Sequence, residues 1–199
     1  MNDHQKQLQQ LSELSGRPEL LLHVCCGVCS VYPLVYLRRY FKITIFFSND
    51  NICPYPEFMK RLDALETYLK VLNDPEIRLI IDGYDNEGWM KEFGHLKDEP
   101  EGGRRCKACY RWRMERAFRY ASKHRYPYCT TVMSISNRKN ALWLNEIGEQ
   151  LQQQYPSVTY LHADLKKDDG ITINERMNKQ LNLYHQDYCG CLFSIRNDG

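Results

Sequence analysis

Residues 19–30, ELLLHVCCGVCS, join a continuous apolar run to three cysteines, Cys25, Cys26 and Cys29. A short apolar run of this kind predicts a strand, at residues 20–24, that is buried on both faces as in a parallel sheet. The cysteines that follow it predict a chemical site at the end of that strand.

The rest of the chain alternates apolar runs with helical patterns. The predicted strands cover residues 20–24, 43–47, 77–81, 128–132 and 158–161. The predicted helices cover residues 31–40, 54–72, 86–93, 106–124, 140–154 and 172–183. This alternation indicates an α/β fold, a single domain with a mainly parallel sheet, right-handed crossovers and helices on both faces. We predict one catalytic domain over residues 19–199, ending in a cysteine-bearing tail, after a polar N-terminal extension over residues 1–18.

Polar or cysteine-containing clusters follow the predicted strands. They begin at Cys25, at residues 48–51, at residues 134–137 and at Asp164. Sites in open α/β sheets form beyond the carboxyl ends of strands, so these clusters predict a single active site.

Composition narrows the cellular context. No run approaches the ~20 apolar residues of a membrane span, and residues 1–16 lack the apolar core of a signal peptide. We therefore expect a cytoplasmic protein without a membrane partner. Nine cysteines in such a chain favour metal binding or catalysis over disulfides.

The cysteine spacings allow several kinds of site. Cys106 and Cys109 open a predicted helix, where the helix dipole favours thiolates. With Cys25 and Cys26 they supply four thiolates, enough for a four-iron cluster. Structural zinc and buried, inert cysteines remain alternatives, although adjacent cysteines rarely bind one tetrahedral zinc. Cys26-Gly-Val-Cys29 alone is also typical of a thioredoxin-like thiol–disulfide oxidoreductase, a hypothesis that leaves Cys106 and Cys109 unexplained.

The remaining cysteines differ in kind. Cys189-Gly-Cys191 would form a strained, reducible disulfide, which suits an electron relay. Cys29 is either a ligand of a second metal or a helix-start residue without a ligand role. Cys53 and Cys129 have no partner spacing, and we expect Cys129 in the core.

Positive charge is concentrated in one segment. Residues 104–125 hold nine Lys or Arg and one acid, a net charge of +8 in a chain whose total is +2. Such a stripe beside a cysteine pair suggests a polyanionic partner. Its arginines and aromatic residues, among them Arg105, Tyr110 and Arg111, suit the phosphates and splayed bases of single-stranded RNA.

At these residues the chain resembles the cobalamin-independent epoxyqueuosine reductases, the QueH family. The resemblance runs from residue 20 to residue 196. The matching stretches are LLHVCCGVCS (21–30), NICPYPEFMKR (51–61), DEPEGGRRCKACYRWRMERA (98–117), TTVMSISNRKNALWLNEIGE (130–149), ADLKKDDG (163–170) and YHQDYCGC (184–191). Two positions depart from the family pattern: Gly27-Val28 replaces Ala-Pro, and Asp50 replaces a proline.

The resemblance implies a HUP/Rossmann-like iron–sulfur reductase that converts epoxyqueuosine to queuosine at the wobble position of the tRNA anticodon. Its partners would be an anticodon stem-loop carrying epoxyqueuosine and an electron donor that the sequence does not identify. It implies a 4Fe-4S cluster, with iron or zinc as candidates for one additional metal ion beside it. The ligands would be Cys25, Cys26, Cys106 and Cys109, and the redox-active pair Cys189 and Cys191.

Further residues are predicted from position in the matching motifs. Asp187 is a candidate proton donor beside the redox pair, and Asn51 and Arg61 are candidate substrate contacts. A zinc-bearing RNA-binding module remains an alternative to the reductase, besides the thiol oxidoreductase.

Overall fold

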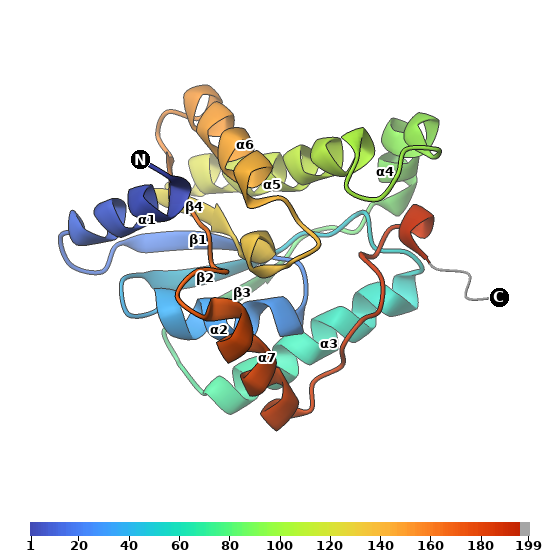
Figure 1. Cartoon of the computed structure of the whole chain (residues 1–199). Coiled ribbons are helices and arrows are strands. Elements are labelled where there is room, and N and C mark those ends of the chain that lie inside the picture. Colours follow the sequence, from blue (N-terminus) through green and yellow to red (C-terminus); the bar gives the residue numbers. More distant parts are fainter. Residues whose placement is uncertain (196–199) are drawn as a thin grey trace.

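The computed structural model describes residues 1–195, and within them a five-stranded parallel sheet forms the centre of the protein (Figure 1). The strands are β1 (Glu19–Val24), β2 (Lys42–Phe47), β3 (Arg78–Ile81), β4 (Tyr128–Thr131) and β5 (Thr159–Tyr160). Their order is β3-β2-β1-β4-β5. The predicted α/β fold is thus confirmed; residues 196–199 of the predicted domain lie outside the described residues.

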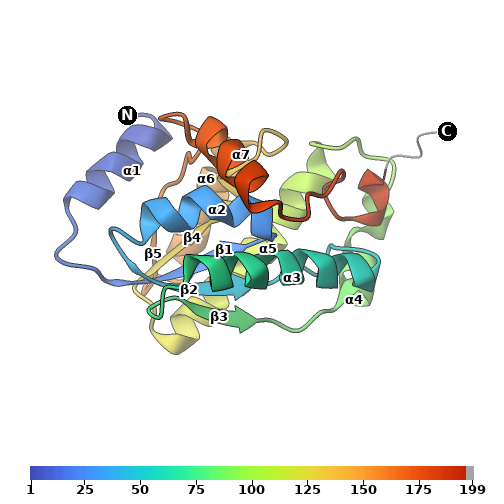
Figure 2. The same cartoon turned by 90° about the horizontal axis from the view of Figure 1, so that it is seen from below.

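Helices cover both faces of the sheet (Figure 2). Their bounds are α1 (Asp3–Ser12), α2 (Gly27–Leu37), α3 (Tyr55–Leu72), α4 (Asn86–Phe93), α5 (Arg104–His124), α6 (Ala141–Gln154) and α7 (Gly170–Leu181). Helices α2, α3 and α7 lie on one face, with α7 packed on α2, and α5 and α6 lie on the other. Short 3-10 turns η1 (Gly94–Leu96), η2 (Val132–Ile135) and η3 (Leu192–Ser194) complete the described elements.

The predicted extension forms helix α1, which lies along the edge strand β5. Leu11 belongs to the core, and the Gln10 amide bonds the Tyr160 carbonyl oxygen and the His162 backbone N–H. The helix therefore covers backbone groups that an edge strand would otherwise expose.

Helix α2 begins four residues earlier than predicted, directly after Cys26. Gly27 allows this, because a Cβ there would lie 2.6 Å from the backbone of Ala64 in α3. An early start places Cys29 in the first helical turn instead of in the preceding loop, so the predicted start at residue 31 is wrong.

Helix α7 is tied to α2 where α2 is locally irregular. Pro33 lies inside α2 and has no backbone N–H to donate. Nearby, the Tyr32 N–H donates to Asn174 Oδ1 at 3.1 Å, and the Val28 carbonyl accepts from Nδ2 of Asn174 and of Asn178 at 2.9 Å. Two asparagines one helical turn apart on α7 thereby satisfy backbone groups of α2.

Candidate active site

The strand order reverses between β1 and β4, and a cavity opens there. Its volume is about 670 Å³. It is bounded by the start of α2, the loop after η2, helix α7 and the tail that follows α7. Cavities at such a switch point are the usual binding sites of open α/β sheets. Of the four clusters predicted to form one site, those at Cys25 and at residues 134–137 line this cavity, whereas residues 48–51 and Asp164 do not.

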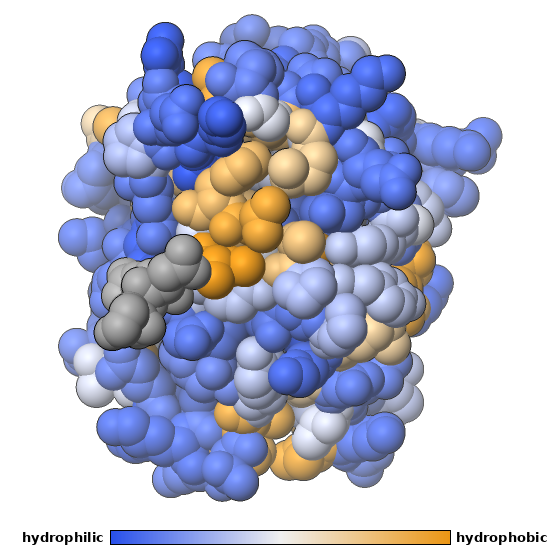
Figure 3. Space-filling view, turned by 90° about the vertical axis from the view of Figure 1, so that its right-hand side faces the viewer, coloured by the Kyte–Doolittle hydropathy of each residue, from blue (hydrophilic) through white to orange (hydrophobic). Residues whose placement is uncertain are grey.

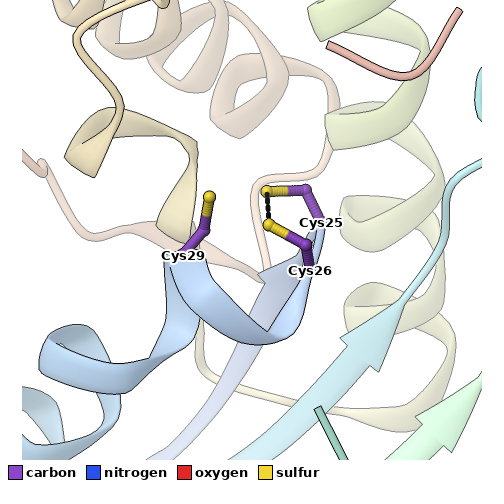
Figure 4. A group of neighbouring side chains, drawn as sticks. All are labelled: Cys25, Cys26 and Cys29. Atoms are coloured by element: carbon purple, nitrogen blue, oxygen red, sulfur yellow. Dashed lines mark hydrogen bonds between the residues drawn. The ribbon is translucent and has the colours of Figure 1, made fainter. Parts of the chain in front are cut away.

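Three cysteines line the base of the cavity (Figure 4). The sulfur atoms of Cys25, Cys26 and Cys29 all lie within 4.8 Å of one another, and those of Cys25 and Cys26 are 3.7 Å apart. Cys25 directly follows β1, whereas Cys26 and Cys29 sit at the start of α2, so one strand–helix junction brings the three thiols together. A group of thiols at this spacing can hold a metal ion or an iron–sulfur cluster.

The thiols of this group differ in pKa. Hydrogen bonds from Cys26 and Cys29 hold the pKa of Cys25 well below its usual range, and the nearby charges of Lys139 and Arg113 act in the same direction. Burial and the neighbouring Cys25 raise the pKa of Cys26 to about 12. Without a metal the group therefore contains one stable thiolate, and metal binding releases protons from the other thiols.

The positive charges around this group belong to Lys139 and Arg113. Burial opposes the charge on Lys139, but Cys189, Cys25 and Cys29 outweigh it and raise the pKa of Lys139. Burial likewise opposes the charge on Arg113, whose pKa is raised by Cys109 first and by Cys25 next. Lys139 and Arg113 therefore keep their positive charges beside the cysteines, where they offset the negative charge of thiolates.

Beneath the cavity, a buried histidine joins three strand ends. His23 Nδ1 is 2.9 Å from Thr131 Oγ1, and Nε2 is 3.0 Å from the Ser48 carbonyl oxygen. Burial, reinforced by Arg113, lowers the pKa of His23 to about 3, so the ring is neutral and donates from Nε2 to the carbonyl. The ends of β1, β2 and β4 are thereby held together next to Cys25.

The second cysteine pair lies in the first turns of α5. Cys106 Sγ accepts a hydrogen bond from the Gly102 N–H at 3.2 Å, while burial raises its pKa. Cys109 packs with Cys191 in a small apolar cluster around Trp89 and Phe93. The charges of both Cys109 and Cys25 raise the pKa of the buried Arg113. The close group of thiols contains Cys25, Cys26 and Cys29 but neither Cys106 nor Cys109, so the second predicted ligand pair stays a prediction.

The apolar cluster continues to the surface near the end of the described chain. Leu192 is 47% exposed and Ile195 is 40% exposed. Figure 3 shows an apolar patch on one face of the protein. Cys191 is buried close behind this end of the chain, in contrast to Cys189, which lines the cavity.

All nine cysteines fall within residues 1–195 and are free thiols. The tail that carries Cys189 and Cys191 is fixed by Arg61, which is only 2% exposed. Its guanidinium donates to the carbonyl oxygens of Cys189 at 2.8 Å and Tyr188 at 3.1 Å, and pairs with Glu57 at 2.7 Å. Arg61 therefore supports the backbone of the tail that carries Cys189 and Cys191, and it also lines the cavity.

The other predicted substrate contacts do not line this cavity. Arg105 donates to the carbonyl oxygens of Leu96, Lys97 and Glu99 and so holds the loop before α5. Arg111 reaches Gln150 on α6. Asn51 and Tyr110 are buried, and Asp187 is exposed, with its carbonyl oxygen bonded by Arg138. Contacts of these residues with a substrate stay predictions.

Asp50, one of the two departures from the family pattern, has a structural role. Its carboxylate pairs with Arg116, accepts from the Trp112 indole at 3.1 Å, and accepts from the Asp85 N–H at 3.0 Å. It therefore joins α5 to the start of α4. The same contacts show that part of the basic stripe is neutralised inside the protein.

Several cavity residues gave no clear signal in the sequence. Lys139 follows β4 in the stretch TTVMSISNRKN, and Asn174 and Asn178 are spaced four apart on one face of a helix. Gln186 lies in the tail, where its Nε2 donates to Cys26 Sγ at 3.1 Å. The four-residue spacing of Asn174 and Asn178, which puts both on one helix face, is a pattern that could have indicated them.

Fold and site together define a Rossmann-like α/β protein with a thiol group for metal binding at the base of a nucleoside-sized cavity. The comparison with known families is specific. The family described as epoxyqueuosine reductase QueH matches residues 20–197. The chain belongs to this family, whose members are enzymes named as reductases.

Relatives from distant bacteria support the assignment. The epoxyqueuosine reductase QueH of Staphylococcus epidermidis is 36% identical, covering 98% of this chain and 83% of its own. That of Haemophilus influenzae is 32% identical, with 95% and 76% covered. That of Thermotoga maritima is 30% identical, with 88% and 90% covered. In the part of the chain that the structure describes, no helix is both long and apolar enough to cross a bilayer.

Proposed function

We propose that this chain reduces epoxyqueuosine to queuosine at the wobble position of tRNA anticodons. The observation that carries the proposal is the thiol group of Cys25, Cys26 and Cys29 at the base of the switch-point cavity, in a chain that belongs to the QueH family. The alternatives, a thioredoxin-like oxidoreductase and a zinc-bearing RNA-binding module, are not favoured by that membership.

The cavity suits one nucleoside turned out of a single-stranded loop. Its 670 Å³ lies within the roughly 300–1,000 Å³ typical of small-molecule sites. Enzymes that act on a base first turn it out of the base stack. Anticodon loops are single-stranded, so turning a base out of them costs little free energy. Arg138, Lys139 and Lys179 line the cavity and offer positive charge to the flanking phosphates.

We assign Cys25, Cys26, Cys106 and Cys109 as ligands of a 4Fe-4S cluster. Two observations support the assignment: Cys25 and Cys26 lie between β1 and α2 while Cys106 and Cys109 lie in the first turns of α5, and the positive charge of Arg113 acts on both Cys109 and Cys25. This set leaves Cys29 as the ligand available to one additional metal ion, iron or zinc. When bound, the cluster would supply single electrons at a potential tuned by burial and hydrogen bonds.

The redox balance of the reaction points to the tail. Opening an epoxide to an alkene consumes two electrons and two protons and releases the oxygen as water. Oxidation of the Cys189 and Cys191 thiols to a disulfide yields two electrons and two protons, so the dithiol closes the balance. An electron donor, not identified by these residues, must then reduce the disulfide.

The chain's own residues also position the proton sources. Arg61 and Arg138 fix the tail backbone at Tyr188 and Asp187. Asp187 stays the predicted proton donor in this proposal, since its exposed side chain can exchange protons with water beside the redox pair.

Anaerobic iron and sulfide quantification, combined with mass analysis of tRNA carrying epoxyqueuosine, tests the proposal. Cys106→Ala should lose cluster iron and the ability to remove one oxygen from the tRNA. Cys129→Ala is the matched control, because Cys129 is buried in β4 away from the cavity. Oxygen removal that persists in Cys106→Ala would overturn the ligand assignment. One bound zinc without iron would instead support the zinc-bearing module.

A further inference from the structure

Gln186 occupies the junction between the cavity and the tail that carries the redox pair. The next residue, Asp187, has its carbonyl oxygen held by Arg138 at 2.9 Å, and the carbonyls of Tyr188 and Cys189 are held by Arg61. The backbone that follows Gln186 is therefore fixed, and its side chain lines the cavity.

The two ends of the Gln186 amide meet different surroundings. Nε2 donates to Cys26 Sγ at 3.1 Å. The opposite end, Oε1, is buried and has no hydrogen-bond partner among the described residues. A sulfur that has lost its proton can only accept, so the N–H end of the amide must face Cys26 whenever that thiolate binds a metal.

The unpaired oxygen belongs to a side chain that lines the cavity. Of the residues lining the cavity within residues 1–195, Gln186 and Asn178 are the two with a buried side-chain oxygen that lacks a partner. Buried acceptors are normally satisfied, and an exception calls for an unseen donor. A nucleoside with hydroxyl or N–H groups provides such donors.

We propose that Gln186 is a positioning residue that connects the substrate to the cysteine site, with its N–H holding Cys26 Sγ and its carbonyl oxygen accepting a hydrogen bond from the bound nucleoside. This inference rests on the proposed function, since it takes Cys26 as a cluster ligand and a nucleoside as the occupant of the cavity.

The two contacts have separate consequences. A hydrogen bond to a ligand sulfur stabilises negative charge, and reduction adds negative charge to the cluster, so losing the bond shifts the midpoint potential to a more negative value. Losing the carbonyl acceptor weakens substrate binding. We expect KM to rise about tenfold, which corresponds to about 1.4 kcal/mol, the contribution of one hydrogen bond.

The test compares Gln186→Leu and Gln186→Asn with Gln153→Leu. Leucine removes both ends of the amide, and asparagine keeps the amide on a stem too short to reach Cys26. Gln153 is an exposed residue of α6 and serves as the matched control. EPR-monitored redox titration of the iron-loaded proteins without tRNA gives the potential, and steady-state assays with tRNA carrying epoxyqueuosine give KM and kcat.

Both Gln186 variants should show a more negative potential and a raised KM, while Gln153→Leu matches the unsubstituted protein. Cluster loss in both Gln186 variants, with unchanged unfolding of the metal-free proteins, would equally identify Gln186 as the support of Cys26. Unchanged potential and KM in both variants would overturn the inference. An unsubstituted protein that binds no cluster would overturn the proposed function instead.

Discussion

Arg61 provides the sharpest test of how the tail is held. Its side chain is 3% exposed and that of its partner Glu57 is 7% exposed, so the pair is removed from water. Arg61→Met deletes the charge, leaves the Glu57 carboxylate buried, and frees the carbonyl oxygens of Tyr188 and Cys189. Removing one member of a buried ion pair costs about 3–5 kcal/mol. We expect a loss of about 4 kcal/mol in the free energy of unfolding.

A second substitution separates two effects of Arg61→Met: the unpaired charge on Glu57 and the lost hydrogen bonds to the tail. In Arg61→Met/Glu57→Gln no charge remains buried, and the Tyr184 hydroxyl, which donates to Glu57 at 2.7 Å, can still donate to the amide oxygen. The double variant should therefore recover about 1–3 kcal/mol relative to Arg61→Met, because the two sites are coupled. The alkylation rate of Cys189 should not recover, because the carbonyl oxygens of Tyr188 and Cys189 still lack the hydrogen bonds from Arg61.

Two anaerobic measurements check this reasoning. Urea unfolding gives the stability, and the alkylation rate of Cys189 reports how firmly the tail is held. Arg119→Met is the control, since Arg119 is an exposed residue of α5 and its loss should cost less than about 0.5 kcal/mol. If Arg61→Met loses under about 1 kcal/mol and Cys189 reacts at its original rate, the anchoring role is wrong.

Three further outcomes follow from the geometry. Gly190→Ala should cost about 1–3 kcal/mol in urea unfolding, because φ is +127° and a Cβ would lie 3.0 Å from Arg61 Nη1; an unchanged midpoint would contradict this. Chelation of iron from the anaerobically loaded protein should lower its unfolding temperature, and iron with sulfide should restore it, whereas identical calorimetric scans would argue against a metal held by the folded state. Hydrogen bonds from Lys6 and His162 lower the pKa of Glu149 in the folded protein, so the stability it contributes is present at neutral pH and is lost as pH falls through the folded value. Amide protection factors in α1, corrected for the intrinsic exchange rate, should fall in acid, and Glu149→Gln should remove that pH dependence.

The sheet was predictable because its strands carry their signal locally. Residues 20–24 and 43–47 are continuous apolar runs, and both form fully buried parallel strands. The start of α2 was not, because Gly27 argues against a helix there in a local reading. The close approach of α3 and the asparagines of α7 offset that cost, and both come from distant segments.

In the site, as in the fold, features with a local sequence signal were predictable and those that depend on distant segments were not. The position of the cysteines at strand ends followed from the alternation of strands and helices. The internal contacts of the basic helix could not be predicted, because the groups that bind its arginines lie far away in the sequence. Arg105 is engaged by three carbonyls, and Arg113 bonds Asn49, 64 residues away. A stripe that resembles a solvated, RNA-facing surface is partly an internal framework for the cysteine site.

The two tail cysteines face different surroundings, and this separation gives the tail its place in the chemistry. Cys189 lines the cavity, whereas Cys191 is 6% exposed and packs beside Cys109 in the apolar cluster. The backbone between them passes through Gly190, where only glycine fits against Arg61 and Ile52. Because the pair stands between the cavity and the start of α5, the anchors that hold the tail also set the position of the proposed redox pair. Substitutions at those anchors should therefore impair electron transfer even where the proposed cluster ligands are untouched.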